Sequence, residues 1–244
     1  MIKSLSIIFP IFNEEPRLKS SFRHILAFLK MKKSFKIEMI FVDDGSNDNS
    51  YKMINNFSKD SKIIKNKNNV KIRIIKSKKN QGKGSALKIG VKQASYDWVL
   101  TTDIDMSVPL FQINNWINKK FIQKKYHAFI GSRSHLKSIV EKKFYRQVLG
   151  NIMSFLIFII LNIKIRDTQC GFKLYNKKIA KFLFSNLKSN GFDHDLELIL
   201  LLKKKNFLVK ELPVKWKHVD NSRLNIFWDP IKMFFGILFM KLRV

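Results

Sequence analysis

The polar and apolar positions of this chain repeat in a regular order through its N-terminal part. Apolar, β-rich runs predict strands at residues 5–10, 37–42, 70–75 and 98–102. Between these runs, apolar residues recur at helical spacing over residues 18–28, 50–57 and 84–94. Nearly continuous apolar strands that alternate with helices indicate an α/β fold with a parallel sheet covered on both faces.

Acidic residues stand directly after two of these predicted strands. Asp43 and Asp44 follow the second strand, and Asp103 and Asp105 follow the fourth. In a sheet of parallel strands, ligands bind beyond the carboxyl ends of the strands. Both acidic clusters are therefore expected at the ligand-binding edge, where Asp43 or Asp44 could accept a hydrogen bond from a nucleotide base or ribose.

Asp103 and Asp105 are one residue apart, which puts both carboxylates on one side of an extended segment. Mg²⁺ and Mn²⁺ commonly bind through one or two carboxylates together with substrate phosphates. An isolated Asp-x-Asp is more often a solvated turn, but its place at the end of an apolar strand favours a metal. We therefore expect Mg²⁺ or Mn²⁺ here, acting as a Lewis acid on a diphosphate leaving group.

The segment 80–85 (NQGKGS) contains two glycines and opens the third predicted helix. A helix start of this kind can approach a phosphate or a ribose. The segment matches no phosphate-loop pattern, so an ordinary helix start is the alternative.

The 244 residues are enough for one large domain, or for one domain with an appendage, and 45% of them are hydrophobic. The single cysteine, Cys170, excludes an intrachain disulfide and a multi-cysteine zinc site. Lys and Arg outnumber Asp and Glu by 47 to 18, which gives a net charge of +29. Such a charge attracts polyanions, namely nucleic acid, anionic lipid or phosphorylated substrates. Compositional drift is the alternative explanation of the excess.

A basic nucleic-acid-binding protein is the alternative from a different functional class. It would use the 22 phenylalanines as stacking residues. These phenylalanines mostly occupy apolar runs, as core residues do, and no base-reading motif is present in the sequence. We therefore expect no nucleic acid partner.

The sequence shows no signal-peptide pattern at its start, and its longest apolar run, residues 152–163, is too short for a full transmembrane helix. Two apolar stretches with basic flanks, 144–165 and 226–242, are predicted as helices that lie in a membrane interface. A core helix is the alternative for each stretch.

Several motifs, taken together, resemble the family 2 glycosyltransferases, which have a GT-A fold. The N-terminal motifs are residues 9–14 (FPIFNE), 42–46 (VDDGS), 80–84 (NQGKG) and 103–107 (DIDMS). Later motifs are similar to the dolichyl-phosphate β-glucosyltransferase branch and its prokaryotic polyprenyl-phosphate relatives. These are residues 131–133 (GSR), 167–174 (DTQCGFKL), 191–197 (GFDHDLE) and 211–224. The ordered set covers nearly the whole chain and is far more specific than any single motif.

The resemblance implies a GT-A (Rossmann-like) domain over residues 1–224, followed by a C-terminal amphipathic membrane-interface helix at 225–244. It implies that the nucleotide sugar contacts Pro10, Asn13, Glu14, Asp43, Asp44, Lys83 and Asp103. It also implies metal binding by Asp103 and Asp105, catalysis by Asp105, Asp195 and Arg133, and binding of the acceptor phosphate by Arg133, Arg146 and Arg223. The alternative for each arginine is a surface charge, and for Asp195 and Glu197 a helix cap or a lysine partner.

The implied reaction is an inverting transfer of a hexose, glucose favoured, from a nucleotide diphosphate sugar, UDP-glucose favoured, to a polyprenyl or dolichyl phosphate. The enzyme would act at the cytoplasmic face of a membrane as a peripheral or monotopic protein. A mannosyltransferase that uses GDP-mannose and a sugar transferase with a non-lipid acceptor are the alternatives. A phosphate monoester has a second pKa of about 6, so the acceptor is largely a dianion at neutral pH and needs no strong base.

Overall fold

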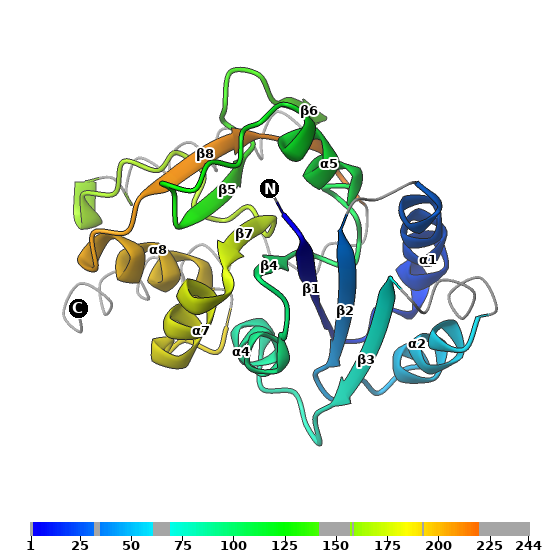
Figure 1. Ribbon diagram of the computed structural model, residues 1–244. Helices are drawn as coiled ribbons and strands as arrows, with labels where there is room; N and C mark the ends of the chain where they lie inside the picture. Colours follow the sequence, from blue (N-terminus) through cyan, green and yellow to red (C-terminus); the bar gives the residue numbers. More distant parts are fainter. Residues whose placement is uncertain are drawn as a thin grey trace.

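The computed structural model describes residues 2–31, 35–60, 69–141, 157, 159–191 and 193–219 (Figure 1). The strands are β1 (Ser4–Ile11), β2 (Lys36–Asp43), β3 (Val70–Lys76), β4 (Trp98–Thr101), β5 (Ala128–Ser132), β6 (Ile139–Glu141), β7 (Lys173–Asn176), β8 (Val209–Pro213) and β9 (Lys215–Lys217). The helices are α1 (Glu15–Lys30), α2 (Ser50–Ser58), α4 (Lys83–Gln93), α5 (Phe111–Asn118), α7 (Lys177–Asn186) and α8 (His194–Lys204). The strands and helices predicted for the N-terminal part all occur, each beginning and ending within about three residues of its predicted bounds, as is usual for pattern-based boundaries.

Within the described ranges, one seven-stranded sheet has the order β3-β2-β1-β4-β7-β5-β8. Strands β1 to β4 are parallel to one another, and β5 is parallel to β8. Strand β7 is antiparallel to both of its neighbours, β4 and β5, so it alone of these seven runs in the opposite direction. The predicted mostly parallel sheet is confirmed. Its parallel strands bring the loops after β1, β2 and β4 to one edge, which is the expected edge for ligands.

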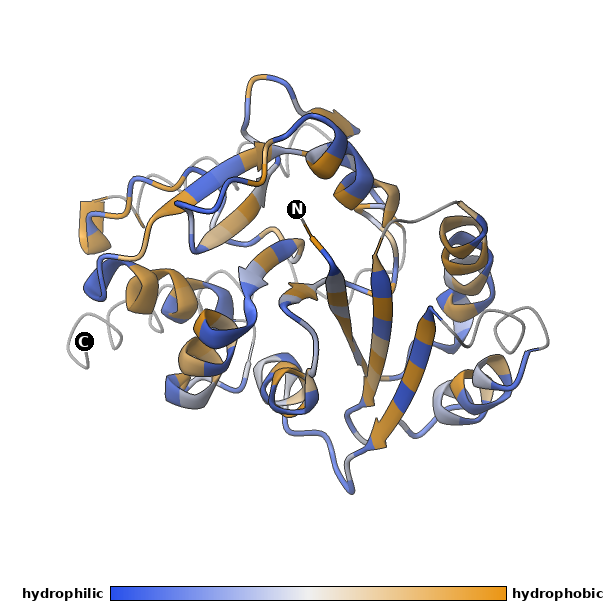
Figure 2. Cartoon of the chain, in the orientation of Figure 1, coloured by the Kyte–Doolittle hydropathy of each residue, from blue (hydrophilic) through white to orange (hydrophobic). Residues whose placement is uncertain are grey.

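The two faces of the sheet are covered by different helices. Along β1, Ile7 and Phe9 pack with residues of α1, α2 and α5, whereas Ile8 between them packs with residues of α4 and α7. This follows from the alternation of side chains along a strand. Figure 2 shows the same alternation as orange and blue bands on β3. The predicted cover of helices on both faces is confirmed.

Strands β6 and β9 form a separate two-stranded parallel sheet. The β9 strand is tied to the turn after β4, because the Lys217 N–H donates to the Ser107 carbonyl oxygen at 2.9 Å. This contact brings a C-terminal strand, which carries Trp216, to the ligand-binding edge of the main sheet.

The predicted interfacial stretch 144–165 is described only at residue 157 and over 159–165. There, Ile157, Leu161 and Ile163 are buried and pack with Ile199 of α8 and its neighbours. Ile159 in the same end is 58% exposed, so these residues have one buried and one exposed side, and the interfacial role of the stretch stays a prediction. None of the helices in the described part of the chain combines the length and apolar character needed to cross a membrane.

Three predictions fall outside the described residues. They are the roles of Arg146 and Arg223 in binding the acceptor phosphate and the C-terminal helix at 225–244.

Candidate active site

The carboxylate of Asp44 is tied to the turn that opens helix α4. It accepts hydrogen bonds from the N–H groups of Gln81 (3.0 Å) and Gly82 (2.7 Å). Asp44 is buried, and this burial raises the pKa of its carboxyl above the ordinary value, although the two backbone donors act in the opposite direction. Asp44 therefore organises the edge of the sheet through backbone contacts.

The turn itself is closed by contacts within the protein. The N–H groups of Gly84 and Ser85 donate to the Asn190 carbonyl oxygen at 2.7 and 3.3 Å. Gly82 has a φ of +101°, and a Cβ there would overlap the same carbonyl oxygen, so glycine is needed at this position. Because these backbone N–H groups already donate to protein oxygens, the geometry favours the ordinary helix start over a loop whose backbone binds phosphate. A phosphate would instead be reached by the Lys83 side chain.

The carboxylate of Asp43, next to Asp44, has no such backbone contacts. It ends β2, its exposed fraction is 0%, and neither of its carboxylate oxygens has a hydrogen-bond partner within the described ranges. Buried polar atoms in folded proteins are normally hydrogen-bonded. The two oxygens are thus buried acceptors without a protein donor, at the residue for which the sequence predicted a contact with the nucleotide.

Asn13 joins the loop after β1 to the loop after β2. Its Oδ1 accepts a hydrogen bond from the Asn47 N–H at 2.7 Å, and its own N–H donates to Ser46 Oγ at 2.8 Å. Pro10 lies half-buried at the end of β1. Glu14 forms an ion pair with Arg17 in the first turn of α1, with 3.3 Å between Glu14 Oε2 and Arg17 Nε. These predicted nucleotide-sugar-binding residues lie at the end of β1 and in the loop after it, which Asn13 ties to the loop that follows Asp43 and Asp44.

Asp103 and Asp105 lie in a turn and not in the extended segment that the sequence predicted. Strand β4 ends at Thr101, Met106 has a φ of +58°, and the Ser107 N–H donates to Asp105 Oδ1 at 2.9 Å. Burial and, next, the neighbouring charge of Asp103 raise the pKa of the Asp105 carboxyl. The two carboxylates are therefore close, as expected, but the turn brings them together and not a shared strand face.

Two cationic side chains face this acidic pair. Lys83 Nζ lies 2.6 Å from Asp103 Oδ1, and Arg17 Nη1 lies 3.9 Å from Asp105 Oδ2. Burial alone would lower the pKa of Lys83, but Asp103 and then Asp195 raise it above the ordinary value. Lys83 is thus a charged ammonium group held directly on one of the predicted metal ligands.

The donor set fits Mg²⁺ or Mn²⁺. The side chains of Asp103 and Asp105 are 34% and 22% exposed, and both offer the hard oxygen ligands that these ions take. Gly171 leaves room for one of them, because a Cβ there would lie 2.5 Å from Asp103 Oδ2. In the described part of the chain, no group of three or more His, Cys, Asp or Glu side chains could hold a metal. One or two carboxylates are the protein ligands with which Mg²⁺ commonly binds when substrate phosphates supply further oxygens.

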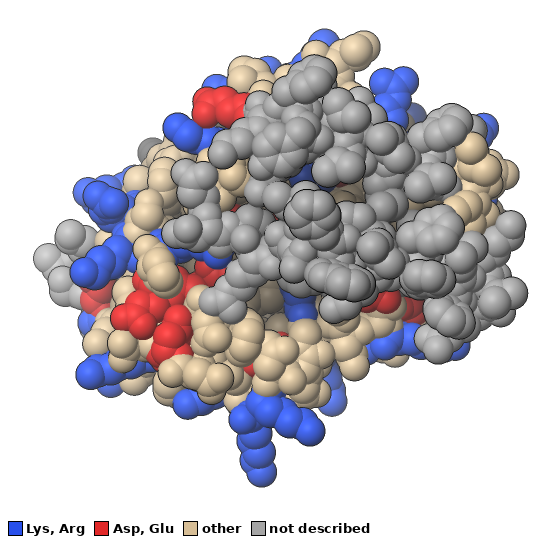
Figure 3. All heavy atoms as spheres, turned by 180° about the vertical axis from the view of Figure 1, so that it is seen from behind, with Lys and Arg blue, Asp and Glu red and all other residues tan. Residues whose placement is uncertain are grey.

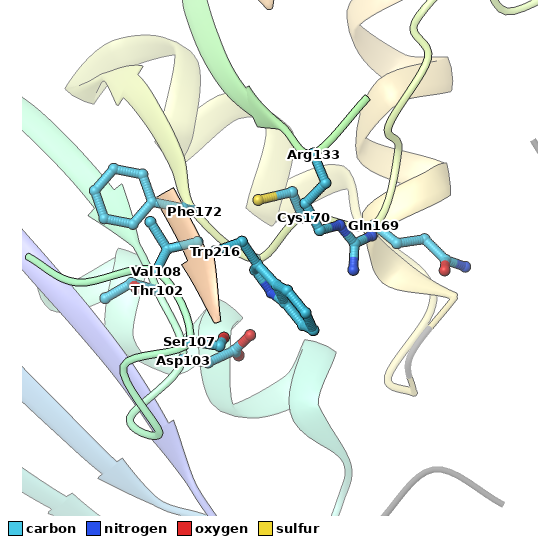
Figure 4. Close-up of a pocket in the computed structure, with 10 residues that line it drawn as sticks. Thr102, Asp103, Ser107, Val108, Arg133, Gln169, Cys170, Phe172 and Trp216 are labelled. Atoms are coloured by element: carbon cyan, nitrogen blue, oxygen red, sulfur yellow. The ribbon is translucent and has the colours of Figure 1, made fainter. Parts of the chain in front are cut away.

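A small cavity of about 40 Å³ opens beside Asp103 (Figure 4). Its lining includes Ser107, Arg133, Gln169 and Trp216, which come from four separate segments. In Figure 4 the Trp216 ring extends toward Asp103 and Ser107. The Arg133 guanidinium carbon lies 5.9 Å from the centre of that ring. The cavity is therefore bordered both by the Asp103 carboxylate and by the Arg133 side chain.

Arg133 is fixed by a two-point ion pair with Asp167. Its Nε and Nη2 donate to the two carboxylate oxygens at 2.7 and 2.8 Å. Burial would raise the pKa of Asp167, but the guanidinium outweighs that effect and holds it below the ordinary value. A guanidinium carries five N–H donors, and two of them are used here. Arg133 is thus a positioned charge in a cavity and not a solvated surface charge.

A groove of about 680 Å³ shares part of its lining with this small cavity. It is lined by Arg17 and His24 of α1, by Asp105, and by the β6–β9 sheet. Ser107 and Trp216 line both the groove and the small cavity. Asp103 therefore borders the small cavity and Asp105 borders the groove.

Asp195, in the first turn of α8, is buried and forms an ion pair with Lys173 of β7. Lys173 Nζ also donates to the Cys170 carbonyl oxygen at 2.7 Å, and His194 Nε2 lies 3.4 Å from Asp195. Burial would raise the pKa of Asp195, but His194 and Lys173 bring it down to about 2. Asp195 therefore pairs with a lysine, which is the structural role given above as the alternative to catalysis, and its carboxyl stays ionised at neutral pH.

Glu197 also has a structural role, which is to accept hydrogen bonds from the backbone. Its two carboxylate oxygens accept hydrogen bonds from the N–H groups of Lys188 (2.8 Å) and Ser189 (2.7 Å). These bonds close the loop before α8.

Three residues of the site were not singled out from the sequence, namely Arg17, Lys173 and Trp216. Lys173 carried a signal, because it stands alone in an apolar run (CGFKLY) and a buried lysine requires a carboxylate partner. The other two had no local signal, since their places depend on how α1 and β9 pack at the edge of the sheet.

Solved structures of glycosyltransferases share this fold. Glucosyl-3-phosphoglycerate synthase from Mycobacterium tuberculosis, in complex with uridine-diphosphate, superimposes with a TM-score of 0.65 at 14% identity, over 99% of this chain and 79% of that chain. A mannosyltransferase from Pyrobaculum calidifontis, in complex with GDP-Man and Mn²⁺, gives a TM-score of 0.59 at 14% identity, over 90% of this chain and 57% of that chain. At this level of identity the likeness establishes the GT-A fold.

Sequence similarity extends further. The dolichyl-phosphate beta-glucosyltransferase of Homo sapiens is 31% identical over 99% of this chain and 76% of its own length, and that of Dictyostelium discoideum is 33% identical over 98% and 74%. The sequence pattern of the family described as glycosyl transferase family 2 matches residues 6–184. This chain therefore belongs to glycosyl transferase family 2, and it is a glycosyltransferase.

Proposed function

We propose that this glycosyltransferase moves a hexose, glucose favoured, from a nucleotide diphosphate sugar, UDP-glucose favoured, to a polyprenyl or dolichyl phosphate at a membrane surface. The observation that carries this proposal is similarity to dolichyl-phosphate beta-glucosyltransferases over 91–99% of the chain. Similarity of that extent includes the segments after β4, which carry Arg133 and Trp216 and form the acceptor side of the proposed site.

On the donor side, the nucleotide would lie over the ends of β1 and β2. The unpartnered oxygens of Asp43 would accept hydrogen bonds from the base or ribose. Pro10, Asn13, Glu14 and Asp44 would shape the loops around it, and Lys83 would donate to the diphosphate. Asp103 and Asp105 would hold Mg²⁺ or Mn²⁺, which when bound stabilises the negative charge of the departing diphosphate.

On the acceptor side, Arg133 would hold the lipid phosphate in the cavity beside Asp103. Asp167 fixes the guanidinium, so the phosphate would meet an oriented donor with little loss of side-chain freedom. An oxygen of the phosphate dianion would form a bond to the anomeric carbon while the bond from that carbon to the diphosphate oxygen breaks. Attack from the face opposite the leaving group inverts the anomeric configuration.

No residue has to remove a proton in this reaction, because the acceptor dianion is already a nucleophile. This agrees with an Asp195 that is ionised and engaged by Lys173. We propose that Asp195 contributes to catalysis by fixing positive charge beside the substrates and not as a general base.

The membrane surface is part of the same proposal, with the enzyme at the cytoplasmic face as a peripheral or monotopic protein. Figure 3 shows Lys and Arg side chains spread around the described part of one face and not gathered in a single patch. A net charge of +29 would favour approach to an anionic bilayer in general.

The test is transfer of radiolabelled sugar from UDP-glucose and from GDP-mannose, in separate reactions, to detergent-solubilised polyprenyl phosphate with Mn²⁺ or Mg²⁺. Wild type and Asp105→Ala are compared. We expect labelled lipid from UDP-glucose, dependent on the metal and reduced at least about a hundredfold in the variant.

Each outcome selects one function. Labelled lipid from GDP-mannose alone would make the enzyme a mannosyltransferase. Folded wild-type protein that yields no labelled lipid from either donor would refute the proposal and point to a non-lipid acceptor or to another donor.

A further inference from the structure

The ammonium group of Lys83 occupies a position on Asp103 that a metal ion would need. Lys83 Nζ lies 2.6 Å from Asp103 Oδ1. The other oxygen, Oδ2, faces Gly171, where a Cβ would be only 2.5 Å away. One carboxylate oxygen is thus packed against the backbone, and the other carries the lysine.

The Lys83–Asp103 pair is placed so that it can exchange partners. The two side chains are 20% and 34% exposed, in contrast to the buried pair of Lys173 and Asp195, whose side chains are 1% and 9% exposed. Water reaches both charges of such a half-buried pair and can solvate the partner that is released. A divalent ion or a diphosphate can therefore reach the pair and replace one partner.

We propose that Lys83 is an exchangeable counter-ion, which neutralises Asp103 until the metal and the nucleotide arrive and then turns to the diphosphate. The proposal rests on the proposed function for the roles of Asp103 and of the diphosphate. It goes beyond that function in making Lys83 a competitor of the metal as well as a ligand of the nucleotide. One residue then weakens binding of the metal alone and strengthens binding of the metal together with the nucleotide.

This role predicts that one substitution of Lys83 changes two affinities in opposite directions. Removing the charge in Lys83→Met frees Asp103, so Mn²⁺ alone is expected to bind roughly three- to tenfold more tightly than in wild type. The same variant loses a donor to the diphosphate, so UDP in the presence of Mn²⁺ is expected to bind about tenfold or more weakly. A lysine that serves only as a structural support or only as a phosphate ligand would not produce the first effect.

The experiment measures free Mn²⁺ by electron paramagnetic resonance during titration of the protein, without nucleotide and then with UDP. The variants are Lys83→Met, Asp103→Asn, and Lys88→Met as the matched control. Lys88 lies on the same helix, and its Nζ donates to Asn190 Oδ1 at 2.9 Å, away from the acidic pair. Circular dichroism confirms that each variant is folded.

Tighter Mn²⁺ binding by Lys83→Met, with Lys88→Met like wild type and Asp103→Asn weaker, is the expected result. Equal or weaker Mn²⁺ binding by Lys83→Met, while Asp103→Asn has lost it, would overturn the exchange role of Lys83 and leave the proposed metal site standing. Mn²⁺ binding that Asp103→Asn does not change, or no binding by any of the proteins without UDP, would overturn the inference. The first of these two results would also contradict the proposed metal site.

Discussion

Two lysine–aspartate pairs stand side by side in the proposed active site, and they differ in exposure. The side chains of Lys173 and Asp195 are 1% and 9% exposed, and those of Lys83 and Asp103 are 20% and 34% exposed. The first pair links β7 to α8, within the C-terminal half of the sheet. The second links the start of α4 to the turn after β4, at the ligand-binding edge.

The comparison teaches that burial decides what an ion pair can do. When both charges are out of water, loss of one partner leaves an uncompensated buried charge, so the pair acts as a permanent part of the fold. When water reaches the charges, the pair contributes little to stability and its partners can be replaced by ligands. The same two residue types thus form a structural pair in one place and, in the proposed function, a binding site in the other.

The largest effect is expected when the buried pair is broken. Lys173→Met would leave Asp195 charged and without its closest cation, and it should lower the free energy of unfolding by about 3–5 kcal/mol. Urea denaturation followed by circular dichroism measures this value. The double variant Lys173→Met/Asp195→Leu should recover most of the loss, and a single variant as stable as wild type would show that the pair is not structural.

Asp195 should also make a pH-dependent contribution of about 2 kcal/mol to the free energy of unfolding, because His194 and then Lys173 lower the pKa of its carboxyl to about 2 from the ordinary 3.8. A depressed carboxyl pKa stabilises the fold above the unfolded value of the pKa, and the effect is lost as pH falls through the folded value. The stability of wild type relative to Asp195→Asn should therefore be constant near neutral pH and fall between about pH 4 and pH 2. Denaturation curves at several pH values measure it, and a flat difference would exclude a depressed pKa.

A smaller effect is expected where the backbone supports the exposed pair. In Gly171→Ala the new Cβ would push against Asp103 Oδ2, 2.5 Å away, and turn the carboxylate out of place. We expect sugar transfer to fall about tenfold, with weaker Mn²⁺ binding, which corresponds to roughly 1.4 kcal/mol. Binding of UDP without metal serves as the control and should change little, because Asp43 and Asp44 are held by other segments.

The smallest effect is expected when the exposed pair is broken. Lys83→Met should lower the free energy of unfolding by about 1 kcal/mol, less than Lys173→Met does, since solvent partly screens this pair. Measured beside Lys173→Met, it tests the comparison directly. Equal losses of stability in the two variants would show that exposure does not separate the two pairs.

The N-terminal half of the sheet could be predicted because its information is local. Strands β1 to β4 and the helices between them carry their own periodicities, and the order of strand and helix along the chain favours a parallel sheet. The clusters at Asp43 and Asp103 follow from the same reasoning, since they end apolar strands. The turn at Asp105 did not follow from it, because a two-residue alternation assumes that the strand continues.

The C-terminal half of the sheet depends on contacts between distant segments. Strand β7 enters between β4 and β5 in the opposite direction, and its pairing partners are far from it in the sequence. Arg133 meets Asp167, and Lys173 meets Asp195, only after that insertion. Motifs indicated that these residues belong to a site, but no spacing rule indicated which of them pair.

The sequence by itself determined the α/β class, the ligand-binding edge and the identity of the acidic residues on it, because hydrophobic periodicity and strand ends are local properties. Tertiary structure alone decided which charges are buried, which remain exposed, and which cation faces which carboxylate. The physical reason is desolvation. An ion pair between a lysine and an aspartate is permanent when neighbouring segments exclude water from it, and it can exchange partners when they do not. Those segments come from elsewhere in the chain.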